Sequence, residues 1–209
     1  GAACAAGEGV VFDGVDDYVE LVGQSLGGPM TIAIWARWDA LNYYSRLCDF
    51  GDGAPGANIL IANSGSSATI QFSIVGSSWK SATAGSIVLG AWTHVVGTVQ
   101  GTTMKVYEDG TVVANTDDGQ EPASLTRANH WLGRSAWDSA YFQGAIKSMQ
   151  IWSRALDAAE VASLHALGGV CLVPAPTLLP SSAPTPLPSL TPLPSSAPTP
   201  LPSSAPTAT

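Results

Sequence analysis

The sequence is poor in positive charge. Only 8 of its 209 residues are Lys or Arg, against 16 Asp and Glu, and the formal net charge is −8 at pH 7. A protein that binds nucleic acid needs a basic patch to neutralise phosphates, and anionic lipid surfaces attract basic clusters. The chain has no basic run of either kind. We therefore expect no nucleic-acid partner and no electrostatic attachment to a membrane.

Long apolar runs are also missing. No stretch approaches the ~20 apolar residues that a membrane-spanning helix needs, so we expect no membrane span. A secretory signal combines a basic segment with an apolar one, and no such pair is visible. The chain begins with Gly1 rather than Met, so we expect a mature form or an excised fragment. The missing signal then says little about location.

Charged residues and glycine are absent from the C-terminal part. No Asp, Glu, Lys or Arg follows Glu160 and no glycine follows Gly169, whereas 12 of the 15 prolines lie between Pro174 and Pro206. This composition predicts a globular domain at residues 1–171 and a Pro/Ser/Thr-rich disordered linker or stalk of polyproline type at residues 172–209. Segments of this kind are O-glycosylated stalks or plain linkers, and both interpretations stay open.

Three cysteines are too few for a disulfide scaffold. Cys4 and Cys171 flank the globular part, and Cys48 lies inside it. Because the two ends of a domain often lie close together, a Cys4–Cys171 disulfide would close the domain and leave Cys48 buried and free. The alternative is an unpaired thiol at the surface.

The globular part has the pattern of β-structure. Short alternating or apolar runs recur between Gly, Asp and Asn residues. The expected strands are 10–12, 17–21, 30–38, 47–50, 59–61, 68–75, 86–89, 92–99, 104–107, 111–113, 130–132 and 142–152. Asp109-Gly110 supplies the positive φ angles of a tight hairpin turn. Many short strands at this spacing predict a two-sheet sandwich or jelly roll.

A single helix is expected after the strands. Asp157 followed by Glu160 forms a capping box, and Gly168-Gly169 can end the helix. The apolar residues at helical spacing are Val161, Leu164 and Leu167. We expect this helix to cover one end of the sandwich.

Several motifs follow one another along the globular part. They are Phe12 to Val19 (FDGVDDYV), Thr31 to Trp35 (TIAIW), Trp92 to Val95 (WTHV), Val106 to Gly110 (VYEDG), Leu132-Gly133, Phe142 to Ile146 (FQGAI), and Ser153 to Leu156 with Glu160. Each motif is weak alone, but their order and spacing together resemble the LamG-like jelly-roll domains of the concanavalin A-like lectin/glucanase superfamily. The resemblance covers about residues 9–167.

The resemblance implies an all-β fold of two antiparallel sheets with jelly-roll connections. It also implies a module of a secreted or surface protein that binds carbohydrate, calcium or another protein. Few such domains are enzymes by themselves. In many relatives an acidic pair follows the Phe-x-Gly-x-Ile motif, but Lys147 and Ser148 stand there in this chain. If that strand normally helps to hold a calcium ion, this chain has lost its contribution.

Three acids near the N-terminus are the candidate metal ligands. Asp13, Asp16 and Asp17 place three carboxylates within five residues, and calcium takes about six to eight oxygen ligands. The other interpretation is a turn beside Gly14, because Asp side chains bond to their own backbone in turns. We favour the turn and keep calcium as the alternative.

Aromatic residues in polar segments are the candidate ligand contacts. Trp137 lies in a polar stretch with Arg134, Asp138 and Tyr141, while Trp79 is flanked by serines and Lys80. Tyr43 and Tyr44 follow Asn42 in a further expected loop. Rings on loops can pack on the C–H face of a sugar. The alternative, which we favour, is that these rings fold back over the edge of the sandwich.

The remaining tryptophans have a plainer interpretation. Trp35, Trp92, Trp131 and Trp152 lie in apolar runs and are expected in the core, whereas Trp38 is ambiguous. His94 lies mid-strand, and we expect a hydrogen-bonded structural role. The chain has no His-x-x-x-His or Cys-x-x-Cys spacing, which argues against zinc.

Signals of catalysis are missing as well. The Glu-x-Asp-x-x-Glu strand of the superfamily's glucanases is absent, as is a Gly-x-Ser-x-Gly nucleophile elbow. We expect no enzyme. The leading hypothesis is a non-catalytic, extracellular carbohydrate-binding module, secreted or cell-wall associated, whose partner is a polysaccharide or a glycoprotein glycan. The alternatives are a protein-interaction or adhesion module of a surface protein and, less favoured, a glycan hydrolase.

Overall fold

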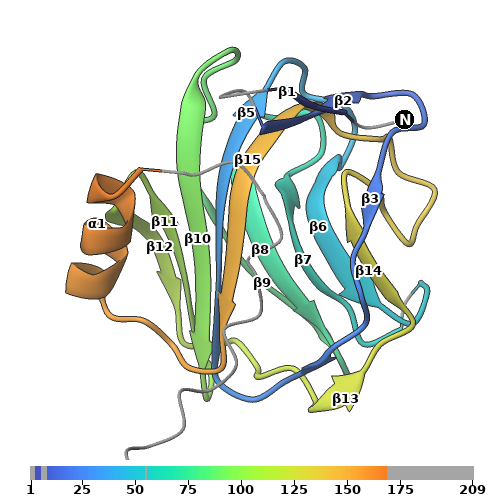
Figure 1. Cartoon of the computed structure of the whole chain (residues 1–209). Coiled ribbons are helices and arrows are strands. Elements are labelled where there is room, and N and C mark those ends of the chain that lie inside the picture. Colours follow the sequence, from blue (N-terminus) through green and yellow to red (C-terminus); the bar gives the residue numbers. More distant parts are fainter. Residues whose placement is uncertain (1–2, 6–8, 55, 169–209) are drawn as a thin grey trace, which may run out of the picture. The chain divides into compact units, whose positions relative to one another are not determined.

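The computed structural model describes residues 3–5, 9–54 and 56–168, and these form a sandwich of two antiparallel sheets with one helix (Figure 1). The expected linker or stalk at residues 172–209 lies outside the described residues. So does Cys171, and with it the expected Cys4–Cys171 disulfide. Cys48 is free and buried, as expected. Within the described part of the chain, no helix has the length and apolar character to cross a membrane.

One sheet has seven strands. Across the sheet they run in the order β1 (Ala3–Ala5), β2 (Gly9–Asp13), β15 (Gln143–Trp152), β5 (Met30–Trp38), β10 (Trp92–Gln100), β11 (Thr103–Glu108) and β12 (Thr111–Thr116). All neighbouring pairs are antiparallel. Because β5 lies between β10 and β15, the sheet is built from strands far apart in sequence. This is the jelly-roll connectivity that the motifs predicted.

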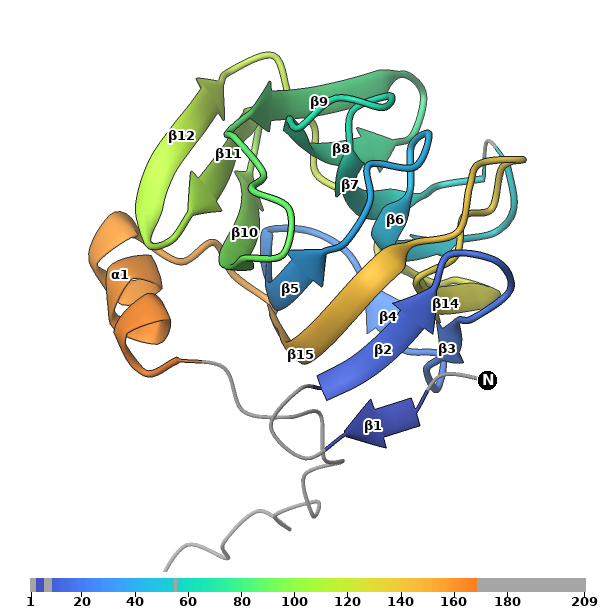
Figure 2. The same cartoon turned by 90° about the horizontal axis from the view of Figure 1, so that it is seen from above.

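The facing sheet has six strands. They run in the order β3 (Val19–Glu20), β14 (Asn129–Leu132), β6 (Arg46–Gly51), β7 (Ile59–Asn63), β8 (Ile70–Val75) and β9 (Trp79–Ala84). A short pair, β13 (Leu125–Thr126) with β4 (Ser25–Leu26), completes the β-structure. Figure 2 shows the two large sheets stacked face to face.

The core fills the space between the sheets. Alternate residues of each strand point inward because successive side chains of a strand face opposite sides. On β5 these are Ile32, Ile34, Ala36 and Trp38, and on β8 they are Ile70, Phe72 and Ile74. Gly97 of β10 faces Phe72, where an added Cβ would lie 2.6 Å from the ring carbon Cγ. The two sheets therefore approach closely at this point only because residue 97 is glycine.

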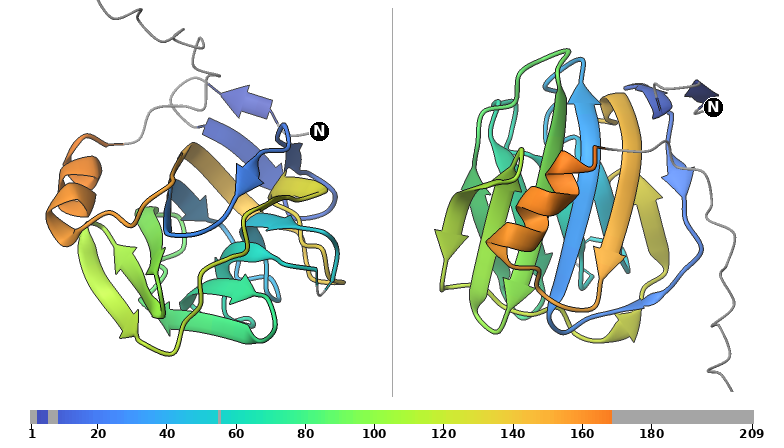
Figure 3. Two further views of the ribbon diagram at one scale, coloured as in Figure 1. Left: turned by 90° about the horizontal axis from the view of Figure 1, so that it is seen from below. Right: turned by 60° about the vertical axis from the view of Figure 1, so that its left-hand side comes forward.

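The helix α1 (Ala158–Ala166) begins with the predicted capping box. The Asp157 side chain accepts a hydrogen bond from the Glu160 backbone, and the Glu160 side chain accepts one from the Asp157 backbone. The expected position was wrong. The helix packs on the outer face of the seven-stranded sheet rather than on one end of the sandwich (Figure 3). Its buried residue Val161 belongs to a cluster with the outward residues Ala33, Val96 and Tyr107.

One predicted strand is not formed, and the six-residue strand β9 was not predicted. Residues 86–89 form no strand, and of them Ile87 is buried whereas Val88 and Leu89 are more than half exposed. Strand β9 was missed because its sequence, WKSATA, is mostly polar. The tight hairpin between β11 and β12 is confirmed, with φ angles of 48° at Asp109 and 81° at Gly110.

The expected burial of the tryptophans was wrong for most of them. Trp38 is fully buried in the core. The four expected core rings are only half-buried, and these are Trp35, Trp92, Trp131 and Trp152. Trp35 alternates with the inward Ile34 and Ala36, so it lies on the outer face of its sheet. An apolar run does not by itself show which of its residues point inward.

Candidate functional site

An open depression of about 350 Å³ lies on the outer face of the six-stranded sheet. Its lining residues come from four segments: Tyr44, Arg46, Gln71, Trp79, Trp137 and Ser139. Gln71 belongs to β8, where it alternates with the core residues Ile70 and Phe72, so it points outward. We name this feature the aromatic depression.

The floor of the aromatic depression is a polar network. Gln71 Nε2 donates to Ser73 Oγ at 2.8 Å, and the hydroxyls of Ser73 and Ser81 lie 2.7 Å apart. Trp79 Nε1 donates to Ser81 Oγ at 2.9 Å, which fixes the direction of the indole. Gln71 Oε1 accepts no hydrogen bond from the described residues. Gln71, which lines the depression, thus offers a free acceptor, and Ser73 is buried beneath it.

The rim of the depression is aromatic. The rings of Trp79 and Trp137 have centroids 5.3 Å apart and are tilted by 53°. Tyr44 lines the depression, and Tyr43 packs edge-on against it with a centroid distance of 4.7 Å. Trp79 is 44% exposed. Exposed rings beside a few fixed polar groups are what a small polar ligand with an apolar face requires.

A buried guanidinium links the rim to the sheet. Arg46 is only 2% exposed, and its Cζ lies 5.7 Å from the Tyr44 ring centroid and 5.6 Å from that of Trp137. Arg46 Nη1 donates to the Tyr44 carbonyl at 3.1 Å. The guanidinium therefore contacts two rings of the aromatic rim, and its hydrogen bond fixes the backbone of Tyr44.

Asp49 lies below this guanidinium. Its Oδ2 accepts from the Ala136 backbone at 3.0 Å and its Oδ1 from Asn58 Nδ2 at 2.7 Å, while Arg46 Nε lies 3.8 Å from Oδ2. The bond to Ala136 ties the loop that carries Trp137 down onto the sheet. Asp49 is fully buried. The pair thus joins three separate segments beneath the depression.

Burial sets the pKa values of this pair. Loss of solvent raises the pKa of Asp49, against which the hydrogen bonds from Ala136 and Asn58 and the charge of Arg46 act. Burial also lowers the pKa of Arg46, and the carboxylate of Asp49 opposes that shift. The hydrogen bonds from Ala136 and Asn58 and the charge of Arg46 therefore favour the charged form of the buried Asp49 carboxyl. Arginine keeps its proton in proteins because its intrinsic pKa is above ~12.

The structure brings together part of the predicted ligand set. Trp79, Trp137 and Tyr44 line the depression, and Tyr43 supports Tyr44. The other predicted contacts, Arg134, Asp138 and Tyr141, do not line it. Trp79 and Trp137 contact each other over the sheet, and this contact does not test the alternative that the rings only cover the sandwich edge.

Arg134 belongs to a different surface. Its Cζ lies 4.7 Å from the centroid of the Tyr18 ring and 4.3 Å from that of the Trp131 ring. The Tyr141 carbonyl accepts a hydrogen bond from Asn42, so that segment is held as a loop support. Asp138 is exposed. These residues frame the loop that carries Trp137 without reaching the depression.

Three lining residues were missed by the sequence reasoning, and these are Arg46, Gln71 and Ser139. The sequence contains a signal for Gln71: it is a polar residue that alternates with the apolar Ile70 and Phe72, so it should point to the opposite face of the strand. Arg46 precedes the buried run LCDF and gave no such signal, because its role depends on rings brought from elsewhere in the chain.

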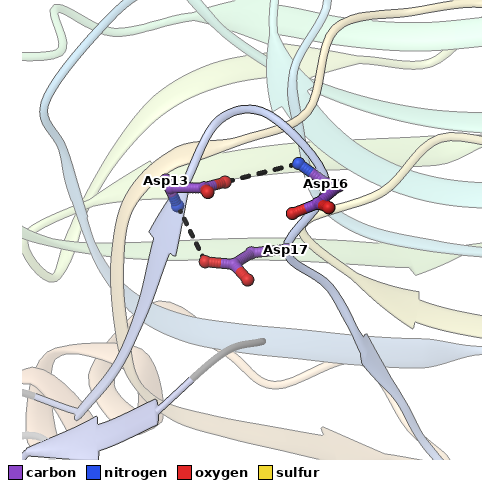
Figure 4. A group of neighbouring side chains, drawn as sticks. All are labelled: Asp13, Asp16 and Asp17. Carbon is purple, nitrogen blue, oxygen red and sulfur yellow. Dashed lines mark hydrogen bonds between the residues drawn. The ribbon is translucent and has the colours of Figure 1, made fainter.

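The three N-terminal acids lie on the turn between β2 and β3 (Figure 4). Their carboxylate oxygens lie within 4.8 Å of one another. Asp13 Oδ1 accepts from the backbones of Val15 at 2.8 Å and Asp16 at 3.3 Å, and Asp17 Oδ2 accepts from the Asp13 backbone at 3.1 Å. The bond from Val15 is the main cause that lowers the pKa of Asp13. These bonds support the turn interpretation, and calcium at this turn stays a prediction.

His94 lies on β10 of the seven-stranded sheet, whereas the depression lies on the six-stranded sheet. It is 2% exposed and stacks on Trp35, with a centroid distance of 5.1 Å. Burial, and next the neighbouring His165, lowers its pKa to about 4. Its Nδ1 has no hydrogen-bond partner among the described residues. The packing supports a structural role, although the expected side-chain hydrogen bond is not seen at this atom.

A carboxylate pair for glycoside hydrolysis would flank a bound sugar. The lining of the depression contains no Asp or Glu. The nearest buried acid, Asp49, is sealed from solvent, and both its oxygens accept hydrogen bonds from the protein. The depression is therefore arranged for contact and hydrogen bonding.

Comparison with known proteins places this geometry in a family context. Residues 13–162 match the model described as the Concanavalin A-like lectin/glucanases superfamily. A comparison with curated proteins found no match.

Solved structures share the fold at low sequence identity. Domain 4 of AbnA, a GH43 extracellular arabinanase from Geobacillus stearothermophilus in complex with arabinotriose, has a TM-score of 0.65 at 21% identity, covering 78% of this chain and 80% of that one. The CBM40 of a Ruminococcus gnavus sialidase, bound to α2,3-sialyllactose, has a TM-score of 0.57 at 16% identity over 72% and 97%. Domains LG4-5 of the mouse laminin α1 chain have a TM-score of 0.58 at 18% identity, covering 73% of this chain and 44% of that one.

Proposed function

Because the chain belongs to the concanavalin A-like lectin/glucanase superfamily, we propose that it is a non-catalytic, extracellular carbohydrate-binding module whose binding site is the aromatic depression. The observation that carries this proposal is the meeting of Trp79 and Trp137, from a strand and a distant loop, above a hydrogen-bonded polar floor. The named neighbours that hold arabinotriose and sialyllactose support the ligand class.

The depression suits the two kinds of surface that a sugar presents. The C–H face of a pyranose packs on the Trp79 or Trp137 ring, which removes apolar surface from water. The hydroxyl groups then meet Gln71 Oε1 and the Ser139 hydroxyl, which line the depression, as hydrogen-bond partners. Because Ser81 and Asp49 fix the indole of Trp79 and the loop of Trp137 beforehand, little ordering is required on binding.

The absence of a carboxylate from the lining supports a binding role over a hydrolytic one. We further propose that residues 172–209 serve as the linker or stalk of this module, on the strength of their Pro/Ser/Thr composition. A secreted or cell-surface location follows from the same proposal, and the extracellular arabinanase among the neighbours is consistent with it.

Affinity electrophoresis of the full chain against a panel of soluble polysaccharides tests the site. We expect one or more polysaccharides to retard the protein. Trp79→Ala or Trp137→Ala should weaken that binding by about tenfold, which corresponds to ~1.4 kcal/mol of lost apolar contact. Trp92→Ala, a half-buried tryptophan of the seven-stranded sheet, is the matched control.

The control should keep wild-type retardation. Equal losses in all three variants would place the effect in stability rather than in the depression. Retardation by no polysaccharide would contradict the proposed function and favour the protein-interaction alternative.

A further inference from the structure

Arg46 is the single charged residue that lines the aromatic depression. We propose that it makes the site selective for glycans that carry an anionic group, either a uronate-type carboxylate or a sulfate ester. This inference rests on the proposed carbohydrate-binding function and narrows its ligand class.

The guanidinium of Arg46 has one free end. Nη1 donates to the Tyr44 carbonyl, and Nε is sealed from solvent without a hydrogen bond. Nη2 makes no hydrogen bond within the described residues and is not among the sealed atoms. Because Arg46 lines the depression although only 2% of it is exposed, Nη2 is the part that a ligand can reach.

The compensating negative charge lies behind the guanidinium. Asp49 is fully buried, and its two oxygens accept from Ala136 and Asn58. It therefore offsets the charge of Arg46 from below and offers no acceptor to a ligand above. The other lining side chains are neutral, and Asp138, the acid next to Trp137 in sequence, does not line the depression.

The position of the guanidinium is fixed before binding. Its Cζ lies within 6 Å of the ring centroids of both Tyr44 and Trp137, at 5.7 and 5.6 Å. A planar guanidinium matches carboxylate and sulfate oxygens, and hydrogen bonds between charged groups are about twice as strong as neutral ones. A pre-positioned arginine loses little side-chain entropy on binding, so an anionic substituent gains most from it.

The net charge of −8 acts against this attraction only at long range. Charges separated by more than ~8 Å are largely screened at physiological ionic strength. Contact between Nη2 and a ligand anion lies well inside that distance. Tests are therefore best made at about 0.15 M salt, where the local contact dominates.

Two matched polymer pairs test the proposal without altering the protein. One pair is a uronic-acid polysaccharide and its carboxyl-reduced neutral form, and the other is a sulfated polysaccharide and its desulfated form. We expect the wild-type full chain to bind one charged member at least about tenfold more tightly than its neutral partner. The pair that shows the difference identifies carboxylate or sulfate as the recognised group.

Arg46→Met should abolish this preference, whereas Lys105→Met, which removes one positive charge from the other sheet, should keep it. Equal affinity of the wild type for both members of each pair overturns the anionic selectivity and leaves the carbohydrate proposal intact. No binding to any of the four polymers overturns both. If Arg46→Met does not fold, the wild-type comparison decides alone.

Discussion

Single buried side chains determine where the aromatic rim lies. Asp49 accepts one hydrogen bond from the loop of Trp137 and one from Asn58, and Arg46 contacts the rings of Tyr44 and Trp137. A buried charge is costly unless it is paired and hydrogen-bonded. The pair is therefore best understood as the support that holds the rim in place for a ligand.

His94 makes stability depend on pH at the same scale. Its pKa in the folded protein is about 4, below the ordinary value of 6.5, because burial and the neighbouring His165 disfavour the charged imidazole. As pH falls from about 6.5 to about 4, the unfolded chain takes up a proton that the folded protein does not, so folding stability declines. Asp109, whose carboxylate faces both histidines, opposes this shift.

We predict that the urea midpoint falls between pH 7 and pH 4.5, and that His94→Asn reduces this fall. His130, whose pKa is also lowered by burial, adds to the decline in the same direction. Above pH 7 the two proteins should show no pH-dependent difference arising from residue 94. An identical decline in wild type and variant would contradict the assignment to His94.

At the scale of elements, the strands that build the site differ in how well the sequence predicts them. Strand β8 has strong alternation, so its existence and its outward Gln71 could be found. Strand β9 lies at the sheet edge and places only the small side chain of Ala82 in the core, so it lacks the strong apolar pattern on which strand prediction depends. Its placement beside β8 comes from pairing that the sequence does not display.

The close approach of β10 to β8 gives a prediction for these elements. A Cβ at residue 97 would lie 2.6 Å from Cγ of Phe72, closer than real contacts allow. We expect Gly97→Ala to destabilise the fold by about 1–3 kcal/mol, as overpacking does. Urea unfolding measures this loss.

Phe72→Leu replaces the ring with a smaller side chain and so makes room for the added methyl group. The double variant Gly97→Ala/Phe72→Leu should therefore lose less stability than the sum of the two single losses. The control is a change of one methyl group outside the sheet contact. Ala91→Gly serves this purpose, whereas Gly90→Ala does not, because the φ angle of Gly90 is positive and an alanine there would be strained for a different reason. Strict additivity of the two changes would contradict a direct clash between residue 97 and Phe72.

At the scale of the whole molecule, the ordered motifs predicted the family and the two-sheet fold. They did not predict which aromatic residues gather, because Trp79, Trp137 and Tyr44, which line one depression, lie outside the motifs in polar segments. They could not predict Arg46, because its value as a ligand contact arises only when rings from two other segments surround it. The position of the helix was predicted wrongly, because a capping box specifies where a helix begins and not the surface on which it packs.

The two outer faces of the sandwich consequently have different roles. The seven-stranded sheet is covered by α1 over Ala33, Val96 and Tyr107. The six-stranded sheet carries the aromatic depression and the polar floor. The proposed glycan site therefore lies on the outer face of the six-stranded sheet.

The indole N–H signals of the tryptophans in an NMR titration test this claim most directly. With a polysaccharide fragment that the protein binds, we predict that the Nε1–H signals of Trp79 and Trp137 shift, while those of Trp35 and Trp92 on the other sheet stay in place. Shifts confined to Trp35 and Trp92, with Trp79 and Trp137 unchanged, would contradict a binding site in the aromatic depression.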